Sequence, residues 1–196
     1  MKQYASSERT KQALALSLKK FMEKKPLNKI TVREIIEDCG VNRKTFYYHF
    51  QDIFDLTEWM FDRDAVDFIR QYNSVENYDD GFRFLFTYIR NNRHLCACAL
   101  DSLGTAYLKR FFYKDLYETV FSVIREAAAG LEVSQEYQEF LADFYLGALI
   151  SVFMNWMRNG MDEEESEKII RYLKLTLRGN LRSALVRADN PNHFLN

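Results

Sequence analysis

Residues 31–50 read Thr-Val-Arg-Glu-Ile-Ile-Glu-Asp-Cys-Gly-Val-Asn-Arg-Lys-Thr-Phe-Tyr-Tyr-His-Phe, and this pattern predicts two short helices joined by a three-residue turn. Thr31 and Glu34 have the spacing of a capping box, which predicts that the first helix begins at Thr31. Gly40 stands where a left-handed residue ends a helix, and Asn42 suits the N-cap of the next one. The stretch therefore predicts a helix-turn-helix.

The second helix of this unit has one apolar side and one polar, basic and aromatic side. Phe46 and Phe50 lie four residues apart, so they are predicted to share the buried side. A helix fits the major groove of B-DNA, where donor-rich and flat side chains contact base edges and phosphates. The candidate DNA-binding residues are Thr31, Asn42, Arg43, Lys44, Thr45, Tyr47, Tyr48 and His49.

Within this set, position along the helix suggests different roles. Arg43 and Lys44 lie at the amino-terminal end, which enters the groove, and are predicted to read bases. Thr45 is predicted to contact a phosphate or a thymine methyl group. Thr31 and the run 47–49 are predicted to donate to phosphate oxygens and to set the register.

Charge is segregated along the chain. Residues 1–50 contain 11 Lys and Arg against 5 Asp and Glu, a net charge of +6, whereas the remainder contains 16 against 23, a net charge of -7. A basic amino-terminal part attracts phosphates while the acidic part is repelled by them. An unevenly charged but ordinary surface would explain the charges alone; together with the helix-turn-helix they favour double-stranded DNA as the partner.

The segment Ile30–Phe50 resembles the DNA-binding segment of TetR-family transcriptional regulators, above all in Gly40-Val41 and in Tyr47-Tyr48-His49-Phe50. With flanking helices, the resemblance covers roughly residues 8–60. Residues 45–56, followed by Trp59, are similar more narrowly to the branch that contains activators of dihydroxyacetone kinase operons. The chain departs from the family pattern at Ile53, where many members carry a lysine that contacts a phosphate.

Length and composition set the outer bounds. With 196 residues, 47% of them hydrophobic, the chain can bury a substantial core as one or two compact units. The amino terminus lacks the apolar stretch of a targeting sequence, and no run reaches the roughly 18–20 apolar residues that span a bilayer. Three cysteines give no disulfide framework. We therefore expect a cytoplasmic protein without membrane association.

Nearly the whole chain has helical periodicity, and strand-like alternation is absent. The two prolines, Pro26 and Pro191, mark the end of the first helix and a frayed carboxyl terminus. Helices are predicted over residues 7–25, 52–72, 82–92, 102–129, 134–159 and 163–188. The predicted fold is all-α: a three-helix helix-turn-helix DNA-binding domain at residues 1–51, followed by a helical effector and dimerisation domain at residues 52–196.

The last two predicted helices carry wide apolar stripes. One consists of Tyr137, Phe140, Leu141, Phe144, Ala148, Val152 and Trp156, and the other of Ile170, Leu173, Leu177, Leu181 and Ala184. Two copies could pair these helices as a four-helix bundle across a two-fold axis, the dimer mode that the resemblance implies. Alternatively, both stripes are buried inside one monomer. A dimer would place two reading helices about 34–36 Å apart or a multiple, on a near-palindromic operator.

Other functions have weaker support. His94, Cys96 and Cys98 suggest a metal or redox site, but buried thiols of a helical core explain them better. No nucleophile, phosphate-loop or complete metal pattern occurs, so we expect neither an enzyme nor a bound cofactor. A helical protein–protein adaptor with a degenerate head remains the alternative, supported only by Ile53. By resemblance, a small molecule or a protein co-regulator controls the output; the abundant aromatic residues are assigned to core packing.

Overall fold

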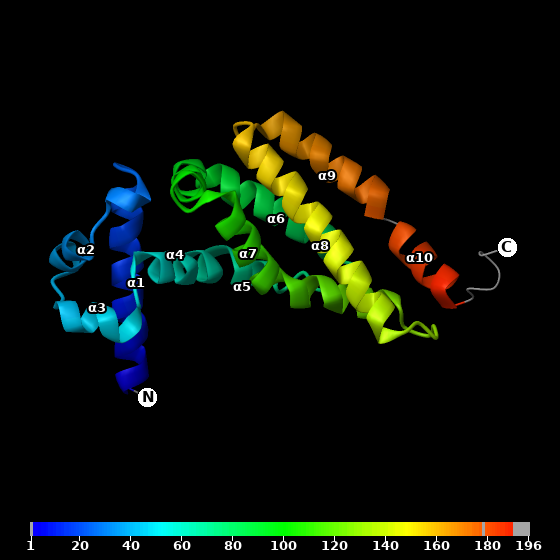
Figure 1. Ribbon diagram of the computed structural model, residues 1–196, viewed down its shortest axis with the longest axis horizontal. Helices are drawn as coiled ribbons and strands as arrows, with labels where there is room; N and C mark the ends of the chain where they lie inside the picture. The colour runs from blue at the N-terminus through cyan, green and yellow to red at the C-terminus, as the bar shows by residue number, and fades with distance from the viewer. Residues whose placement is uncertain (1, 178, 190–196) are drawn as a thin grey trace. The chain divides into compact units, whose positions relative to one another are not determined.

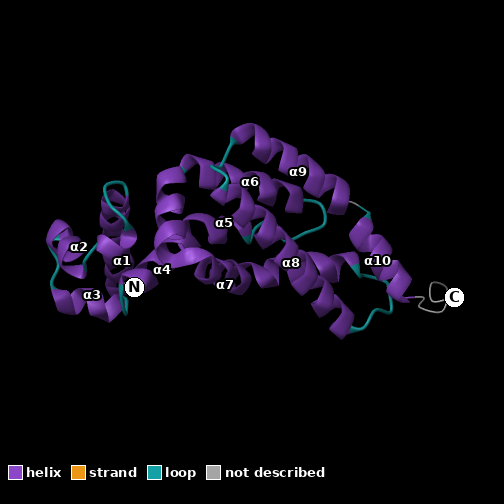
Figure 2. Cartoon of the chain, turned by 45° about the horizontal axis from the view of Figure 1, so that its top comes forward, coloured by secondary structure: helices purple, strands orange, loops and turns teal. Residues whose placement is uncertain are grey.

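The computed structural model describes residues 2–177 and 179–189, and side chains from residue 7 onward, so Pro191 lies outside the described part. Within these residues the regular structure is helical, without strands (Figure 2). The all-α prediction is confirmed. The elements are α1 (Lys2–Met22), the 3₁₀ turn η1 (Leu27–Lys29), α2 (Val32–Cys39), α3 (Arg43–His49), α4 (Ile53–Phe61), the π-helical turn η2 (Asp62–Val66), α5 (Asp67–Ile69), α6 (Tyr78–Asn91), α7 (Arg93–Ala127), α8 (Gln135–Arg158), α9 (Glu163–Leu177) and α10 (Asn180–Asp189).

The chain forms two compact units, which are described one at a time. Unit 1 consists of Met1–Asp64 and Asn92–Leu108, and unit 2 consists of Ala65–Asn91 and Lys109–Asn196. The boundary predicted after residue 51 falls inside unit 1. It stays a prediction about where the DNA-binding function ends along the chain.

Unit 1 is built around α1, against which α2 and α4 pack (Figure 1). Its core includes Leu14, Leu18 and Ile35, all fully buried, together with Phe46 from α3. Ile30 and Leu27 bury the turn that follows α1, which explains why the chain folds back there. The result is a three-helix head in which α3 has one side on the core and the other in solvent.

The local signals of the helix-turn-helix are confirmed. Thr31 is the N-cap of α2 in a complete capping box with Glu34, and Asn42 is the N-cap of α3. Gly40 ends α2 with φ of 64°, a conformation that a residue with a Cβ adopts only at a cost. These caps fix the three-residue turn and therefore the direction of α3.

Several helix boundaries differ from those predicted. α1 ends at Met22, and the segment predicted as one helix over 52–72 is interrupted by the π-helical turn η2. The prediction of one continuous helix over 163–188 is wrong, because Gly179 with φ of 80° separates α9 from α10. α7 begins at Arg93 and is kinked at Gly104, whose φ is 79°. An isolated glycine in a helical pattern is compatible with either continuation or a break, so sequence periodicity missed both breaks.

Unit 2 packs α6, α7, α9 and α10 around the apolar side of α8 (Figure 1). Trp156 on α8 is fully buried, with its ring 4.7 Å from that of Phe86 on α6. Its indole Nε1 donates to the carbonyl oxygen of Asp162 over 2.8 Å, which satisfies the one polar atom of the side chain. Ion pairs of Arg83 with Glu167 and of Lys174 with Asp79 connect α6 to α9.

Among the described residues, α8 is the one helix that is long and apolar enough to cross a membrane by length and composition. No run of this kind was expected from the sequence. Half of the apolar window is buried inside the unit. Its exposed side also lacks a continuous charged stripe, because Gly147, Ala148 and Ser151 occupy it.

The first predicted apolar stripe divides between the interior and the surface, whereas the second lies inside unit 2. Leu141 and Trp156 of α8 are buried, whereas Phe140 and Phe144 are 57% and 58% exposed and stack on one another. Of the second stripe, Ile170 and Ala184 are buried, and Leu173, Leu177 and Leu181 are partly buried. The structure thus leaves an aromatic patch of Phe140 and Phe144 on the outside of α8.

Candidate nucleic-acid interface

The solvent-facing side of α3 is formed by the residues that the sequence predicted to meet DNA. Arg43 and Lys44 are exposed, and the rings of Tyr47 and Tyr48 are 47% and 80% exposed. Phe46 is fully buried on the opposite side, as its spacing predicted. The helix is therefore anchored by one side while its polar and aromatic side stays available for a partner.

Arg43 and Tyr47, one helical turn apart, form a single flat surface. The guanidinium carbon lies 5.5 Å from the centre of the Tyr47 ring, and Nη2 donates to the Tyr47 hydroxyl over 3.3 Å. Stacking on an aromatic face restricts the long arginine side chain before any partner binds. A guanidinium ordered in this way presents its remaining donors as a planar fork, the geometry that pairs with guanine or phosphate.

Three other predicted DNA-binding residues, Thr31, Asn42 and Thr45, form the hydrogen bonds that cap α2 and α3. The Asn42 side-chain oxygen accepts from the Thr45 backbone N–H over 2.8 Å and from the Thr45 hydroxyl over 3.1 Å. The Thr31 hydroxyl is engaged in the cap of α2. Because the Asn42 oxygen is used by the cap, its NH₂ group is the part that can donate to a phosphate.

His49 differs from its neighbours because it is only half-exposed. Burial and the nearby Lys11 ammonium lower the pKa of His49 below its ordinary value of 6.5, although Glu8 opposes the shift. The imidazole is therefore neutral at pH 7. It can donate one hydrogen bond but does not add a positive charge to the surface.

Carboxylates on α2 are held in ion pairs. Glu34 pairs with Lys25, and Asp38 pairs with Lys20. The Lys25 ammonium and the Thr31 hydroxyl and N–H lower the pKa of Glu34 to about 2. By contrast, no described carboxylate lies within ion-pair distance of Arg43 or Lys44. Positive charge is thus left uncompensated on α3, where a polyanion would gain most from it.

The departure at Ile53 has a structural explanation. Ile53 begins α4 and packs, partly buried, against the core of unit 1. Asp52 caps the same helix by accepting from the Asp55 backbone N–H over 2.9 Å. An aliphatic side chain here contributes to the core of the head, so its presence does not by itself indicate a degenerate domain.

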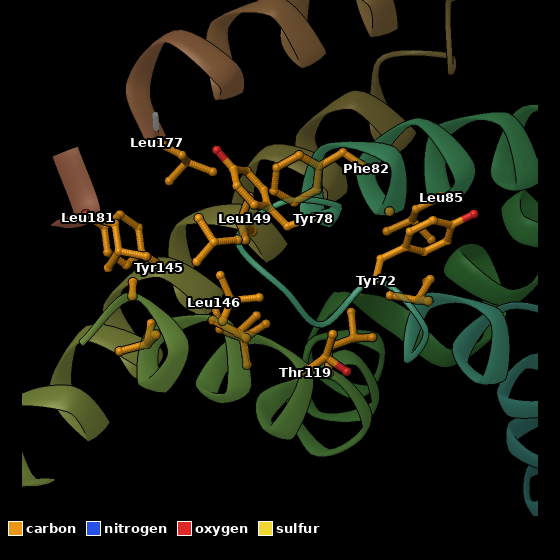
Figure 3. A pocket seen from close by; sticks show the side chains of 18 of the residues that line it. Tyr72, Tyr78, Phe82, Leu85, Thr119, Tyr145, Leu146, Leu149, Leu177 and Leu181 are labelled. Atoms are coloured by element: carbon orange, nitrogen blue, oxygen red, sulfur yellow. The ribbon is translucent and has the colours of Figure 1, made fainter. Parts of the chain in front are cut away.

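Unit 2 contains a second candidate site, a cavity of about 250 Å³. Helices α6, α7 and α8 form most of its wall, and Ile69 of α5, the segment 72–75, the end of α9 and the start of α10 complete it. Figure 3 shows Leu146, Leu149 and Thr119 among the wall residues. The aromatic residues of this region are predicted from the sequence to pack in the core, and none is predicted to bind a ligand. Periodicity indicates that a side chain points inward, but not whether the space in front of it is filled.

The predicted thiols lie in the interior. Cys96 is buried, and burial raises the pKa of its thiol to about 12. Cys98 is half-buried and its Sγ donates to the carbonyl oxygen of Lys25. Within residues 2–177 and 179–189 no three metal-ligating side chains gather at one point. The cysteines therefore pack in unit 1 as small hydrophobic side chains.

This combination of a capped helix-turn-helix head and a separate helical unit defines a class of bacterial DNA-binding regulators. Residues 19–58 match the model described as "Bacterial regulatory proteins, tetR family", and residues 76–179, more than half of the chain, match the model described as "Transcriptional regulator C-terminal region". The chain belongs to the TetR family of transcriptional regulators.

Two individual proteins are similar to it. The HTH-type dhaKLM operon transcriptional activator DhaS of Lactococcus lactis subsp. lactis (strain IL1403) is 25% identical over 84 residues, which are 43% of this chain and 45% of that protein. The chain thus matches less than half of the length of this curated relative. A solved structure titled "Dihydroxyacetone kinase operon activator DhaS" shares the fold, with a TM-score of 0.64, 19% identity and coverage of 86% of this chain and 96% of that one.

Proposed function

We propose that this transcriptional regulator acts in the cytoplasm as a homodimer that reads a near-palindromic DNA operator with α3. The observation that carries the proposal is the exposed, carboxylate-free pair of cations at the start of α3. Long-range attraction by this pair steers the head to the phosphate backbone, and the groove then selects sequence. A good bidentate contact discriminates between bases by about 1–3 kcal/mol.

Specific roles follow from the geometry. Arg43, preordered on Tyr47, is assigned to a base edge, and Lys44 to the neighbouring base. Tyr48, the most exposed of the aromatic residues on α3, is assigned to a phosphate. The remaining predicted contacts, Thr31, Asn42, Thr45 and His49, are assigned to phosphate positioning because each is partly committed to a cap or to burial.

The aromatic patch of Phe140 and Phe144 supports the dimer. Two large aromatic rings more than half exposed on the apolar helix α8 lose unfavourable contact with water when another copy covers them. Tyr172 and Leu175 on α9, exposed by 50% and 71%, offer further apolar surface on the neighbouring element. A two-fold contact through α8 and α9 makes a four-helix bundle, which gives the operator its symmetry.

Output is proposed to be controlled through unit 2. Its cavity supplies a place for a small-molecule effector, and the name of the similar activator suggests a kinase operon as the regulated target. An effector acts by binding more tightly to one of two arrangements of the dimer, which shifts their populations. A protein co-regulator that contacts unit 2 is the alternative source of the signal.

Selection of bound duplexes from a random pool by the purified full-length protein tests the proposal. We expect a recovered sequence with two inverted half-sites whose centres are separated by one helical turn or a multiple. Recovery of a single asymmetric site would contradict the dimer. Enrichment of no sequence, both with and without a cellular extract that contains potential co-regulators, would contradict sequence-specific DNA binding.

A further inference from the structure

The cavity of unit 2 is nearly uniform in its chemistry. Of the lining side chains that the structure describes, Arg182 is the one that carries a charge, and none is a carboxylate. The rest are aliphatic or aromatic side chains, with a few hydroxyl groups. Transfer of a charged group into such surroundings costs far more than transfer of a neutral group, unless a counter-charge is present.

Arg182 is already engaged by backbone carbonyl groups. Its Nη1 donates to the carbonyl oxygen of Ala127, and to that of Ala129 over 3.2 Å. Ala127 is the last residue of α7, so the guanidinium lies at the negative end of that helix. Because Arg182 is exposed and its Nη1 is held by these carbonyl oxygens, the helix end offsets part of its charge and water screens the rest, so it gives little counter-charge to a ligand in the apolar interior.

The hydroxyl groups of Thr119 and Tyr145 on the wall are neutral. Thr119 lines the cavity from α7 and is 8% exposed (Figure 3). Tyr145 lines it from α8, and burial raises the pKa of its phenol above the ordinary value, so the phenol keeps its proton. These groups can each give or take a hydrogen bond but cannot neutralise an ion.

The volume limits the size of an occupant. An engineered apolar cavity of about 150 Å³ in another protein takes up benzene, so a cavity of 250 Å³ has room for a molecule of roughly ten non-hydrogen atoms. That size corresponds to one or two fused rings. A disaccharide or a nucleotide does not fit without a large change in unit 2.

We propose that the cavity of unit 2 binds an uncharged, mainly apolar ring compound of about ten non-hydrogen atoms, with its one polar group beside Thr119. This inference rests on the proposed function, in which unit 2 receives the effector. It defines the class of signal: a lipophilic small molecule, and neither an anionic metabolite nor a sugar.

A matched probe series tests the charge requirement. Benzamide, benzoate and benzamidinium share a ring and a planar substituent of nearly one size, and differ in charge. Titrations of full-length protein at pH 7 are followed by the ligand NMR signals. Benzamide is expected to bind about tenfold or more tightly than either ion. Equal binding of the three probes, or tighter binding of benzoate or benzamidinium, would overturn the proposal.

Two variants tie the binding to the cavity. Leu149→Trp fills the space and is expected to weaken benzamide binding at least tenfold, whereas Leu16→Trp, the same change at an exposed site of unit 1, leaves it unaltered. Thr119→Val keeps the shape and removes the hydroxyl, so benzamide affinity should fall about three- to tenfold while toluene affinity stays constant. Unaltered benzamide affinity in a folded Leu149→Trp or Thr119→Val protein contradicts the proposed site.

A parallel measurement separates this inference from the function on which it rests. Duplex binding is measured with the same protein and no probe. Intact sequence-specific binding without any preference for the neutral probe overturns only the cavity assignment. Absence of specific duplex binding overturns the proposed function, whatever the probes do.

Discussion

Thr31 and Glu34 bind one another's backbones across the first turn of α2. The Glu34 N–H donates to the Thr31 hydroxyl oxygen over 3.3 Å, and the Thr31 N–H donates to a Glu34 carboxylate oxygen over 2.9 Å. The same carboxylate pairs with Lys25 near the end of α1. One acidic side chain thus fixes the start of α2 and connects it to the segment that follows α1.

Removal of the capping hydroxyl should destabilise the head. Thr31→Ala is expected to lower the free energy of unfolding by about 1 kcal/mol, because the Glu34 N–H loses its partner. Thr31→Ser, which keeps the hydroxyl, serves as the control and should restore most of the loss. Urea denaturation followed by circular dichroism gives the comparison. Equal stability of the alanine and serine variants would show that the cap contributes nothing.

The low pKa of Glu34 predicts a dependence of stability on pH. Its folded-state pKa of about 2 is below the ordinary value of 4.5, so the stabilisation is fully present above about pH 5. It is lost as the pH falls from there towards 2, because protonation removes the bonds with Lys25 and Thr31. We expect wild-type protein to be more stable than Glu34→Gln at pH 7, with the difference shrinking at pH 3. A constant difference between these pH values would contradict the ion pair.

The lowered pKa of His49 predicts a second dependence of stability on pH. Its pKa is lowered in the folded protein, so the unfolded chain takes up a proton more readily as the pH falls through 6.5. Wild-type protein should therefore lose stability between pH 7 and pH 5 relative to His49→Gln, whose side chain does not titrate. Thermal unfolding at the two pH values measures the difference. If wild-type protein gains stability over His49→Gln between pH 7 and pH 5, the pKa of His49 is not lowered in the folded protein.

Gly81 on α6 allows a close approach that a larger residue would prevent. A Cβ atom built at this position would lie 2.9 Å from the Cβ of Tyr72. Gly81→Ala is expected to destabilise the protein by about 1–3 kcal/mol despite the better helix propensity of alanine. Because Tyr72 and Gly81 both line the cavity, benzamide affinity should fall as well. An alanine variant as stable as wild type would show that α6 moves away at little cost.

The aromatic patch predicts the oligomeric state. The double variant Phe140→Glu and Phe144→Glu places four carboxylates across the proposed two-fold contact, so it should sediment as a monomer. The rings are largely in solvent within one copy, so the fold should be retained. Leu16→Glu, at a leucine of unit 1 that is 65% exposed, is the control and should not alter the mass. Sedimentation equilibrium distinguishes the outcomes, and a dimeric double variant would contradict this interface.

The sequence was sufficient for the head because its signals are local. Thr31, Gly40 and Asn42 act within four residues of their own positions, so their roles can be predicted without knowledge of the rest of the fold. The exposed positions on α3 follow in turn from the burial of Phe46. By contrast, the break at Gly179 leaves helical periodicity almost unaltered, and only tertiary packing decides it.

The cavity and the surface patch also depend on packing between distant segments. Phe82, Tyr145 and Phe153 were expected to be core residues, and they do point inward, but towards a space that remains open. Phe140 and Leu141 are neighbours in one predicted stripe, yet one is exposed and the other buried. Hydrophobicity identifies both as candidates for burial, and the number of neighbouring helices decides which of them is covered within a monomer.

The most direct test of the central claim is the salt dependence of operator binding by an Arg43→Ala and Lys44→Ala double variant. The reference is Lys114→Ala with Arg125→Ala, which removes the same charge from exposed sites of unit 2. We expect the α3 variant to lose at least about 2 kcal/mol of binding free energy on the selected operator, and most of its preference over random duplex. The reference variant should bind like wild type, with its steep salt dependence. Equal affinity and equal preference in the two variants would contradict DNA reading by α3.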